Sequence, residues 1–119
     1  METTIFDKNG NPLAYIAEDA ENSIYTWDGN AVCYLVSDKI FGWKGRHIGW
    51  FINGYIYDIN GKKVGYIKST CPSTPKIEKI KSVKKIKKIK GLRKVSYIKP
   101  LLSFCTSSIP LLDFLSQDS

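Results

Sequence analysis

"IYDINGKKVGYI" at residues 56–67 is the stretch that decides the fold, because it has the pattern of a β-hairpin. Two short apolar runs flank an Asn60-Gly61 turn, and Asn-Gly is a pair that tight hairpin turns prefer. Three near-copies precede it, which are "IFDKNGNPLAYI" (5–16), "IYTWDGNAVCYL" (24–35) and "IFGWKGRHIGWF" (40–51). The chain is therefore built on a repeated hairpin unit.

Several positions of this unit have a structural role in all four copies. A glycine sits at each turn, where a positive φ is expected. These turn glycines are Gly10, Gly29, Gly45 and Gly61. One position of the returning strand is always small, which indicates that backbones converge near a common axis. The residues of this small slot are Ala14, Cys33, Gly49 and Gly65. Period-two alternation predicts that Leu13 and Tyr15 share one face of their strand. Ala14 and Ile16 are then expected on the other face.

An isolated hairpin is marginal in water, so the four hairpins are expected to share a core. The copies begin 19, 16 and 16 residues apart, and this near-equal spacing favours closure into a ring over a meander or a sandwich. We expect an all-β domain at residues 1–70, made of four tandem β-hairpins in a pseudo-fourfold, flower-like arrangement.

The fourfold unit at residues 5–67 resembles the bacterial family described as the 4-fold beta flower domain. That resemblance implies four hairpins arranged like petals, followed by a low-complexity segment and a short apolar C-terminus. It implies no activity and no catalytic residue, so no functional role is carried over. YD-type and WG-type repeats also use aromatic-x-x-x-Gly hairpins, but they form much longer arrays and rank second.

The basic charge of the chain belongs to its C-terminal part. Residues 1–70 hold seven Lys or Arg and eight Asp or Glu, a net charge of −1, whereas residues 71–119 hold eleven against three, a net charge of +8. Residues 71–106 form a low-complexity segment, in which the basic run begins at Lys76, after a linker rich in Ser, Thr and Pro at residues 69–75. We expect this segment to be a separate, extended basic appendage.

Aliphatic residues recur in this segment with a strict period of three from Ile77 to Leu101. An α-helix or a strand would scatter them around its faces, whereas a polyproline II chain keeps them on one edge. Such a chain would span roughly 75 Å. The girth of a 70-residue domain is on the order of 90 Å. The segment is therefore expected to wrap around the hairpins, with its aliphatic edge inward and its lysines outward. Disorder is the alternative.

The last part of the chain, residues 107–119, is predicted to contain a short apolar helix. Ser108 is the expected N-cap and Pro110 falls in the first turn. Its apolar face is expected to consist of Leu111, Leu112, Phe114 and Leu115. We expect this face to dock on the hairpin domain, with a partner-binding peptide as the alternative.

Catalytic and metal-binding patterns are not found in the sequence. The three cysteines are far apart and lack a CxxC spacing, and no phosphate loop or nucleophile elbow occurs. The position of His47 suggests no Ser, Cys or Asp that could act with it in catalysis, and we expect it to be a surface residue next to a turn. We therefore expect no enzyme, no cofactor and no metal. The absence of a signal-peptide pattern and the reduced thiols favour a cytoplasmic protein.

Three interpretations of the basic segment remain open beside that of a non-catalytic binding or structural module with an unknown protein partner. The first is nucleic-acid binding through residues 76–99. Its candidate contacts are Lys84, Lys85, Lys87, Lys88, Lys90, Arg93 and Lys94, with Trp27 and Trp43 as stacking residues. The second is association with an anionic membrane surface. The third is a solvated basic face, with both tryptophans packed over the neighbouring hairpin.

Overall fold

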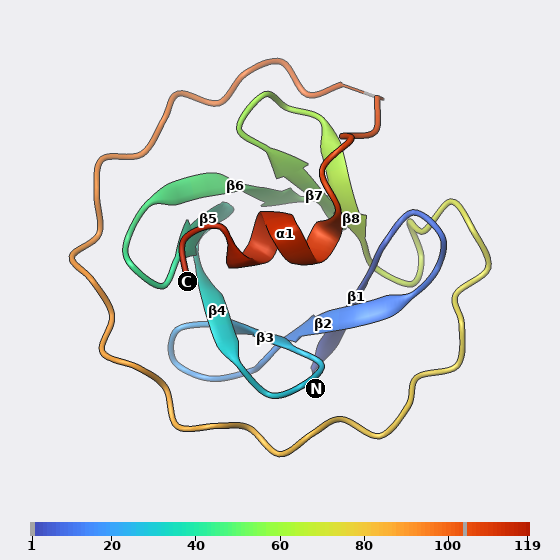
Figure 1. Cartoon of the computed structure of the whole chain (residues 1–119). Helices are drawn as coiled ribbons and strands as arrows, with labels where there is room; N and C mark the ends of the chain where they lie inside the picture. The colour runs from blue at the N-terminus through green and yellow to red at the C-terminus, as the bar shows by residue number, and fades with distance from the viewer. Residues whose placement is uncertain (1, 104) are drawn as a thin grey trace.

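The computed structural model of the protein describes residues 2–103 and 105–119. Eight antiparallel strands pair in chain order and close into a barrel, because Phe6 of the first strand pairs with Tyr66 of the last (Figure 1). The strands are β1 (Thr3–Phe6), β2 (Pro12–Ile16), β3 (Ser23–Thr26), β4 (Ala31–Val36), β5 (Lys39–Gly42), β6 (His47–Ile52), β7 (Tyr55–Asp58) and β8 (Lys63–Tyr66). The predicted all-β arrangement of four tandem hairpins is confirmed. We call the hairpins β1–β2, β3–β4, β5–β6 and β7–β8 petals 1 to 4.

Each petal turns at its glycine. Gly10, Gly29, Gly45 and Gly61 have φ values between +81° and +102°, a region that other residues adopt only with strain. The amide of each of these glycines donates a hydrogen bond to the carbonyl three residues earlier, at 2.9 to 3.1 Å. Asp7 and Asp58 support the turns of petals 1 and 4, where each carboxylate accepts the amide of the residue two positions later at 2.9 Å.

A β-bulge lies at the same place in every petal. In petal 1 the partner of β1 changes from Ala14 to Pro12 between Ile5 and Phe6, which leaves Leu13 as the extra residue. The equivalent residues of the other petals are Val32, Ile48 and Val64. The prediction of a strict alternation was wrong here, because the bulge lets both the extra residue and the small slot contact the core inside the barrel.

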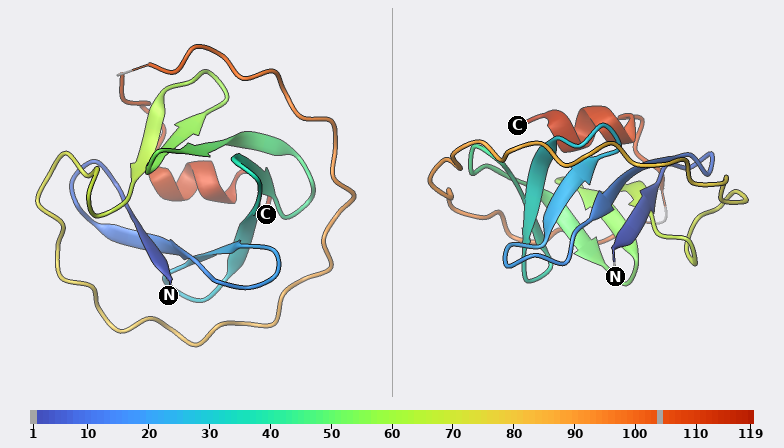
Figure 2. Two further views of the ribbon diagram at one scale, coloured as in Figure 1. Left: turned by 180° about the vertical axis from the view of Figure 1, so that it is seen from behind. Right: turned by 90° about the horizontal axis from the view of Figure 1, so that it is seen from below.

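The core fills the barrel and is closed at one end by a single short helix. The core residues include the isoleucine that begins each petal, and these residues are Ile5, Ile24, Ile40 and Ile56. Helix α1 (Leu111–Ser116) lies across the mouth of the barrel, as the edge-on view shows (Figure 2). Its Leu111, Phe114 and Leu115 are at most 2% exposed, so the predicted docking of the C-terminal helix is confirmed. Leu112 is 38% exposed, so its assignment to the docking face was wrong.

The small slot provides the space that α1 occupies. A Cβ atom on Gly49 would lie 2.7 Å from Cζ of Phe114, and one on Gly65 would lie 3.0 Å from Cδ1 of Leu111. The Cys33 thiol donates to the carbonyl of Leu115 at 2.9 Å. The space at the axis, which large side chains in the small slot would fill, is therefore occupied by one helix.

The start of α1 differs from the prediction. Its N-cap is Pro110, and no side chain caps the helix, so the assignment of Ser108 as N-cap was wrong. Ser107 instead accepts the amide of Ile109 through its hydroxyl at 3.1 Å, one turn earlier in the chain.

The segment between barrel and helix wraps around the petals, as predicted. Figure 1 and Figure 2 show it as a loop that encircles the barrel outside all eight strands. We call residues 76–103 the belt. The belt contains neither helix nor strand, and its backbone bonds to the turns of the petals instead.

Belt and petals are matched in register. The amides of four belt residues, each nine positions after the last, donate to the carbonyls of the four turn glycines at 2.8 to 2.9 Å. These residues are Lys76, Lys85, Lys94 and Ser103. A Cβ atom on any turn glycine would also lie only 2.1 to 2.6 Å from a belt carbonyl or from that of Thr74. The turn glycines thus serve both the turn and the belt, and three triplets of belt span one petal.

Candidate interaction surface on the belt

The belt has the opposite orientation from the one predicted. Its aliphatic row faces solvent, with 88 to 98% of each residue exposed. The nine residues of this outer row are Ile77, Ile80, Val83, Ile86, Ile89, Leu92, Val95, Ile98 and Leu101. A basic row faces the barrel instead, and we call it the inner row. It consists of Lys81, Lys84, Lys87, Lys90 and Arg93. The wrap itself was predicted correctly, but the edge that it buries was not.

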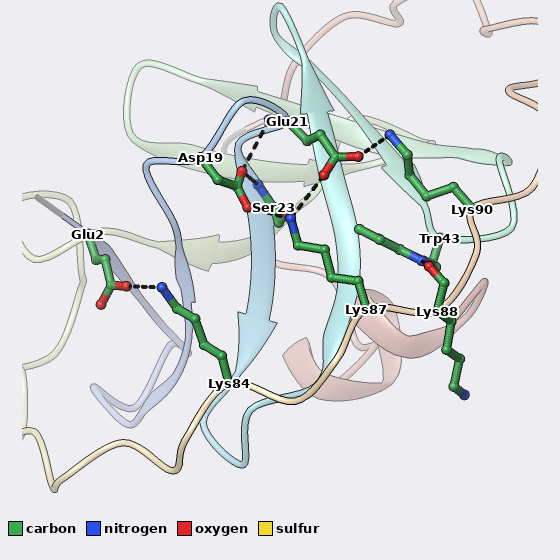
Figure 3. A network of polar contacts seen from close by, with 9 residues as sticks. All are labelled: Glu2, Asp19, Glu21, Ser23, Trp43, Lys84, Lys87, Lys88 and Lys90. Carbon is green, nitrogen blue, oxygen red and sulfur yellow. Dashed lines mark hydrogen bonds and ion pairs between the residues drawn. The ribbon is translucent and has the colours of Figure 1, made fainter.

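Carboxylates on the barrel hold the first part of the inner row (Figure 3). Glu2 pairs with Lys81 at 3.0 Å and with Lys84 at 2.8 Å. Lys87 contacts Asp19 at 2.7 Å and Glu21 at 2.9 Å, and Glu21 also pairs with Lys90. Asp19 and Glu21 belong to the loop between petals 1 and 2, so one short acidic loop anchors two triplets of the belt.

The lysines of these ion pairs lower the pKa values of the carboxylates that they contact. Burial alone would raise the pKa of Asp19, but hydrogen bonds from Lys87 and Ser23 outweigh burial and hold this pKa at about 2. The pKa of Glu21 is lowered by hydrogen bonds from Lys90 and Lys87. Side chains in these pairs are roughly 30% exposed, so each pair is expected to contribute on the order of 0.5 kcal/mol.

Aromatic rings at the petal junctions hold the inner row as well. Tyr15 stacks on Tyr25 between petals 1 and 2, and Tyr34 stacks on Phe41 between petals 2 and 3. The ammonium of Lys81 lies 4.6 Å from the centre of the Tyr15 ring, and that of Lys90 lies 4.3 Å from the Tyr34 ring. These cation–π contacts explain why a basic row, and not an aliphatic one, faces this surface.

Trp27 and Trp43 connect the same junctions to the belt backbone. Each indole meets a tyrosine edge-on and donates its Nε1 hydrogen to a belt carbonyl. The acceptors are Lys79 at 3.2 Å and Lys88 at 2.7 Å, which are nine residues apart. Trp43 is only 3% exposed, so it cannot act as a stacking residue for nucleic acid without leaving its site. Both tryptophans pack over the neighbouring hairpin.

His47 is buried, and its prediction as a surface residue was wrong. It is 1% exposed and meets the ring of Trp50 edge-on. Its Nε2 lies 2.9 Å from the carbonyl of Gly49, and its Nδ1 accepts the amide of Tyr97 at 2.8 Å. These partners require a neutral ring with the hydrogen on Nε2, and burial lowers the pKa of His47. The sequence gives no signal of this role, because the partner is fifty residues away.

The predicted nucleic-acid contacts are divided between two faces of the belt. Lys84, Lys87, Lys90 and Arg93 belong to the inner row, where carboxylates and rings engage them. Lys85, Lys88 and Lys94 belong to a third row of the belt. Figure 3 shows Lys88 pointing away from Lys87 and Lys90. Within the described part of the chain, no ion pair involves Lys88 or Lys94.

Lys81 of the inner row and Glu2, the barrel residue that pairs with it, were not identified from the sequence. Asp19 and Glu21, which hold Lys87, were also overlooked. The one available signal was the acidic loop at residues 17–21, where three carboxylates occur within five residues and no basic residue opposes them.

Among the residues that the structure describes, pockets open between petals on the side of α1. They have volumes of about 510, 660 and 300 Å³ and lie at the junctions of petals 1 and 2, 3 and 4, and 4 and 1. The remaining junction is occupied by Asp118, which accepts the amides of Lys44 at 3.0 Å and Arg46 at 2.7 Å. The largest pocket contains His47, whose two ring nitrogens already have partners.

Residues 2–103 and 105–119 contain neither a metal-binding cluster nor a membrane-spanning helix. No group of three or more potential metal ligands occurs there. Cys33 is buried, whereas Cys71 and Cys105 are more accessible, and all three are free thiols. No helix in these ranges has the length and apolarity needed to cross a bilayer.

Comparison with known families matches residues 3–115 to the family described as "4-fold beta flower protein". No match was found among curated proteins, and none among solved structures. The family match includes the belt and most of α1, beyond the petals on which the sequence resemblance rests.

Proposed function

The chain belongs to the 4-fold beta flower protein family, and we propose that it is a non-catalytic binding module that acts through the outer row of its belt. The observation that carries this proposal is the run of nine aliphatic side chains exposed by 88 to 98%. Large contiguous apolar surfaces on soluble proteins usually mark interaction sites.

The outer row does little for the stability of the chain itself. The belt is held through its backbone and its inner row, and the exposed aliphatic side chains bury almost no area against the barrel. Polar residues at these nine positions would keep the same intrachain contacts. A repeated choice of Ile, Val and Leu therefore points to a partner that buries them.

The non-catalytic part of the proposal is supported by the buried ionisable groups. Both nitrogens of His47 are engaged in hydrogen bonds. The Cys33 thiol is hydrogen-bonded to Leu115, and burial raises its pKa, so a thiolate is disfavoured. Neither group is poised to transfer a proton or to attack a substrate.

The test is an affinity purification from an extract of the source cells with three immobilised chains. They are the wild type, a belt variant (I86S/I89S/L92S) and a control with equally exposed changes outside the belt (K62S/K68S). We expect the belt variant to lose partners that the control retains. Equal retention of partners by the belt variant would contradict the proposal, as would a wild-type chain that retains neither protein nor lipid from the extract. Circular dichroism would verify that all three chains are folded.

A further inference from the structure

One arc of the belt combines its outer row with exposed lysines of the third row. Between residues 79 and 94 the third row contributes four lysines, which are Lys79, Lys85, Lys88 and Lys94. The same arc contains five aliphatic residues of the outer row, which are Ile80, Val83, Ile86, Ile89 and Leu92. No Asp or Glu occurs at residues 79–94. The solvent side of this arc is therefore both aliphatic and cationic.

The inner row faces the barrel, and this leaves only the outer row and the third row on the solvent side of the belt. Lys84, Lys87 and Lys90 are engaged with barrel carboxylates, so the charge they carry is largely balanced within the chain. Lys88 points away from them (Figure 3). The arc thus presents to a partner the aliphatic side chains of the outer row and the exposed third-row lysines, and not the whole basic segment.

We propose that residues 79–94 of the belt dock on an anionic lipid bilayer, with the aliphatic row at the acyl boundary and the third-row lysines at the headgroups. This inference rests on the proposed function and names the partner of the same surface. Aliphatic side chains and lysines side by side are the combination that an anionic interface accepts, because each finds its own layer. The long methylene stems of the lysines let their charges reach the headgroups.

A nucleic acid fits this arc less well. Phosphates would engage Lys88 and Lys94 but would leave the adjoining aliphatic side chains against a charged and hydrated backbone. Binding of single strands relies on aromatic rings that stack on bases, and the arc itself contains none. The nearest indoles, Trp27 and Trp43, donate to belt carbonyls on the barrel side.

The backbone of the arc is also fixed in place before any partner binds. Lys85 and Lys94 are fastened through their amides to the turns of petals 2 and 3 at 2.9 and 2.8 Å, and the carbonyl of Lys88 accepts the indole of Trp43. A fixed backbone keeps the rows from rotating and lowers the entropy lost on docking. The molecule measures about 38 × 37 × 22 Å and the belt curves around it, so a flat bilayer contacts one arc at a time.

The experiment is sedimentation of the full chain with vesicles of phosphatidylcholine alone or mixed with phosphatidylserine. We expect binding to the mixed vesicles and not to phosphatidylcholine alone. Binding should fall about tenfold or more for I86S/I89S and for K88E/K94E. The control K62E/K68E carries the same change in net charge outside the arc and should bind severalfold more tightly than K88E/K94E. Circular dichroism and urea unfolding would establish that each variant is folded.

Each other outcome overturns the lipid inference. Equal binding to both vesicle types, or equal binding by the two charge variants, would exclude recognition of anionic lipid by this arc. Retardation of DNA or RNA that is lost in K88E/K94E but kept in I86S/I89S, without vesicle binding, would assign the arc to nucleic acid. If vesicles do not bind while the belt variant still loses protein partners, the lipid inference fails and the proposed function stands. If both assays fail, both proposals fail.

Discussion

Replacing Phe114 with alanine tests whether the C-terminal helix is part of the barrel core. Phe114 is 1% exposed, and its ring reaches the place where a Cβ on Gly49 would be. Truncation of a fully buried Phe to Ala typically costs about 3–5 kcal/mol, because apolar contact is lost and a cavity remains. A domain of this size is expected to have a stability of about 5–15 kcal/mol, so F114A should remove a large share of it.

Urea unfolding of the full chain is the suitable assay. With a slope of about 2 kcal/mol per molar urea, a loss of about 4 kcal/mol lowers the midpoint by about 2 M. Leu112 is the matched control, because it lies on the same helix and is 38% exposed. L112A should cost less than about 1 kcal/mol.

Two results would refute this reasoning. One is a midpoint for F114A within error of that for L112A. The other is a loss of helical signal in F114A while the tryptophan fluorescence, which reports on Trp27, Trp43 and Trp50, still changes at the wild-type urea midpoint. Either would mean that α1 rests on the barrel without sharing its cooperative core.

Three further predictions concern the belt and the turns. Because burial lowers the pKa of His47 below 6.5, the unfolded chain binds more protons as the pH falls below that value. Stability should thus decline between about pH 6.5 and the lowered pKa; urea midpoints at several pH values should show this slope in the wild type and lose it in H47Q. Exchanging Ile86 with Lys87 (I86K/K87I) places an aliphatic side chain against the acidic loop and should lower the free energy of unfolding by about 1–3 kcal/mol. Exchanging Ile86 with Lys85 (K85I/I86K) moves residues only between exposed rows and should change it by less than about 0.5 kcal/mol in the same assay. For G29A we expect a loss of about 2 kcal/mol or more, since φ is +95° and the new Cβ would lie 2.2 Å from a belt carbonyl. Faster hydrogen exchange at the Lys85 amide, which bonds to Gly29, should accompany that loss, and unchanged exchange would contradict the contact.

Much of the barrel was predictable because its causes are local. The turn glycine, the initial isoleucine and the small slot recur in each unit, and hairpins join residues that are close in the chain. The bulge was not predictable from the sequence. It changes which side chains face inward, but the same residues could also form a regular strand without a bulge. Leu13 therefore contacts the core although simple alternation places it on the outside.

The candidate surface was predicted in part. The period of three correctly indicated an extended segment that wraps the petals. Of the two interpretations of Trp43, packing over the neighbouring hairpin is the one observed. Its burial depends on Tyr34 and on the carbonyl of Lys88 from the belt, which the sequence does not place beside it. His47 was misplaced for the same reason, since its partner Tyr97 arrives only when the belt is closed.

The sequence by itself determined that four hairpins form and that a segment with three distinct rows surrounds them. Which row faces the barrel was decided only by the tertiary structure. Burial of an aliphatic row would be favoured against an apolar surface, but the barrel turns its isoleucines inward to its own core. The outside that remains consists of tyrosine ring faces and of carboxylates such as Glu2 and Asp19. Ring faces and carboxylates both attract ammonium groups, so the lysines turn inward and the aliphatic row is left exposed to solvent.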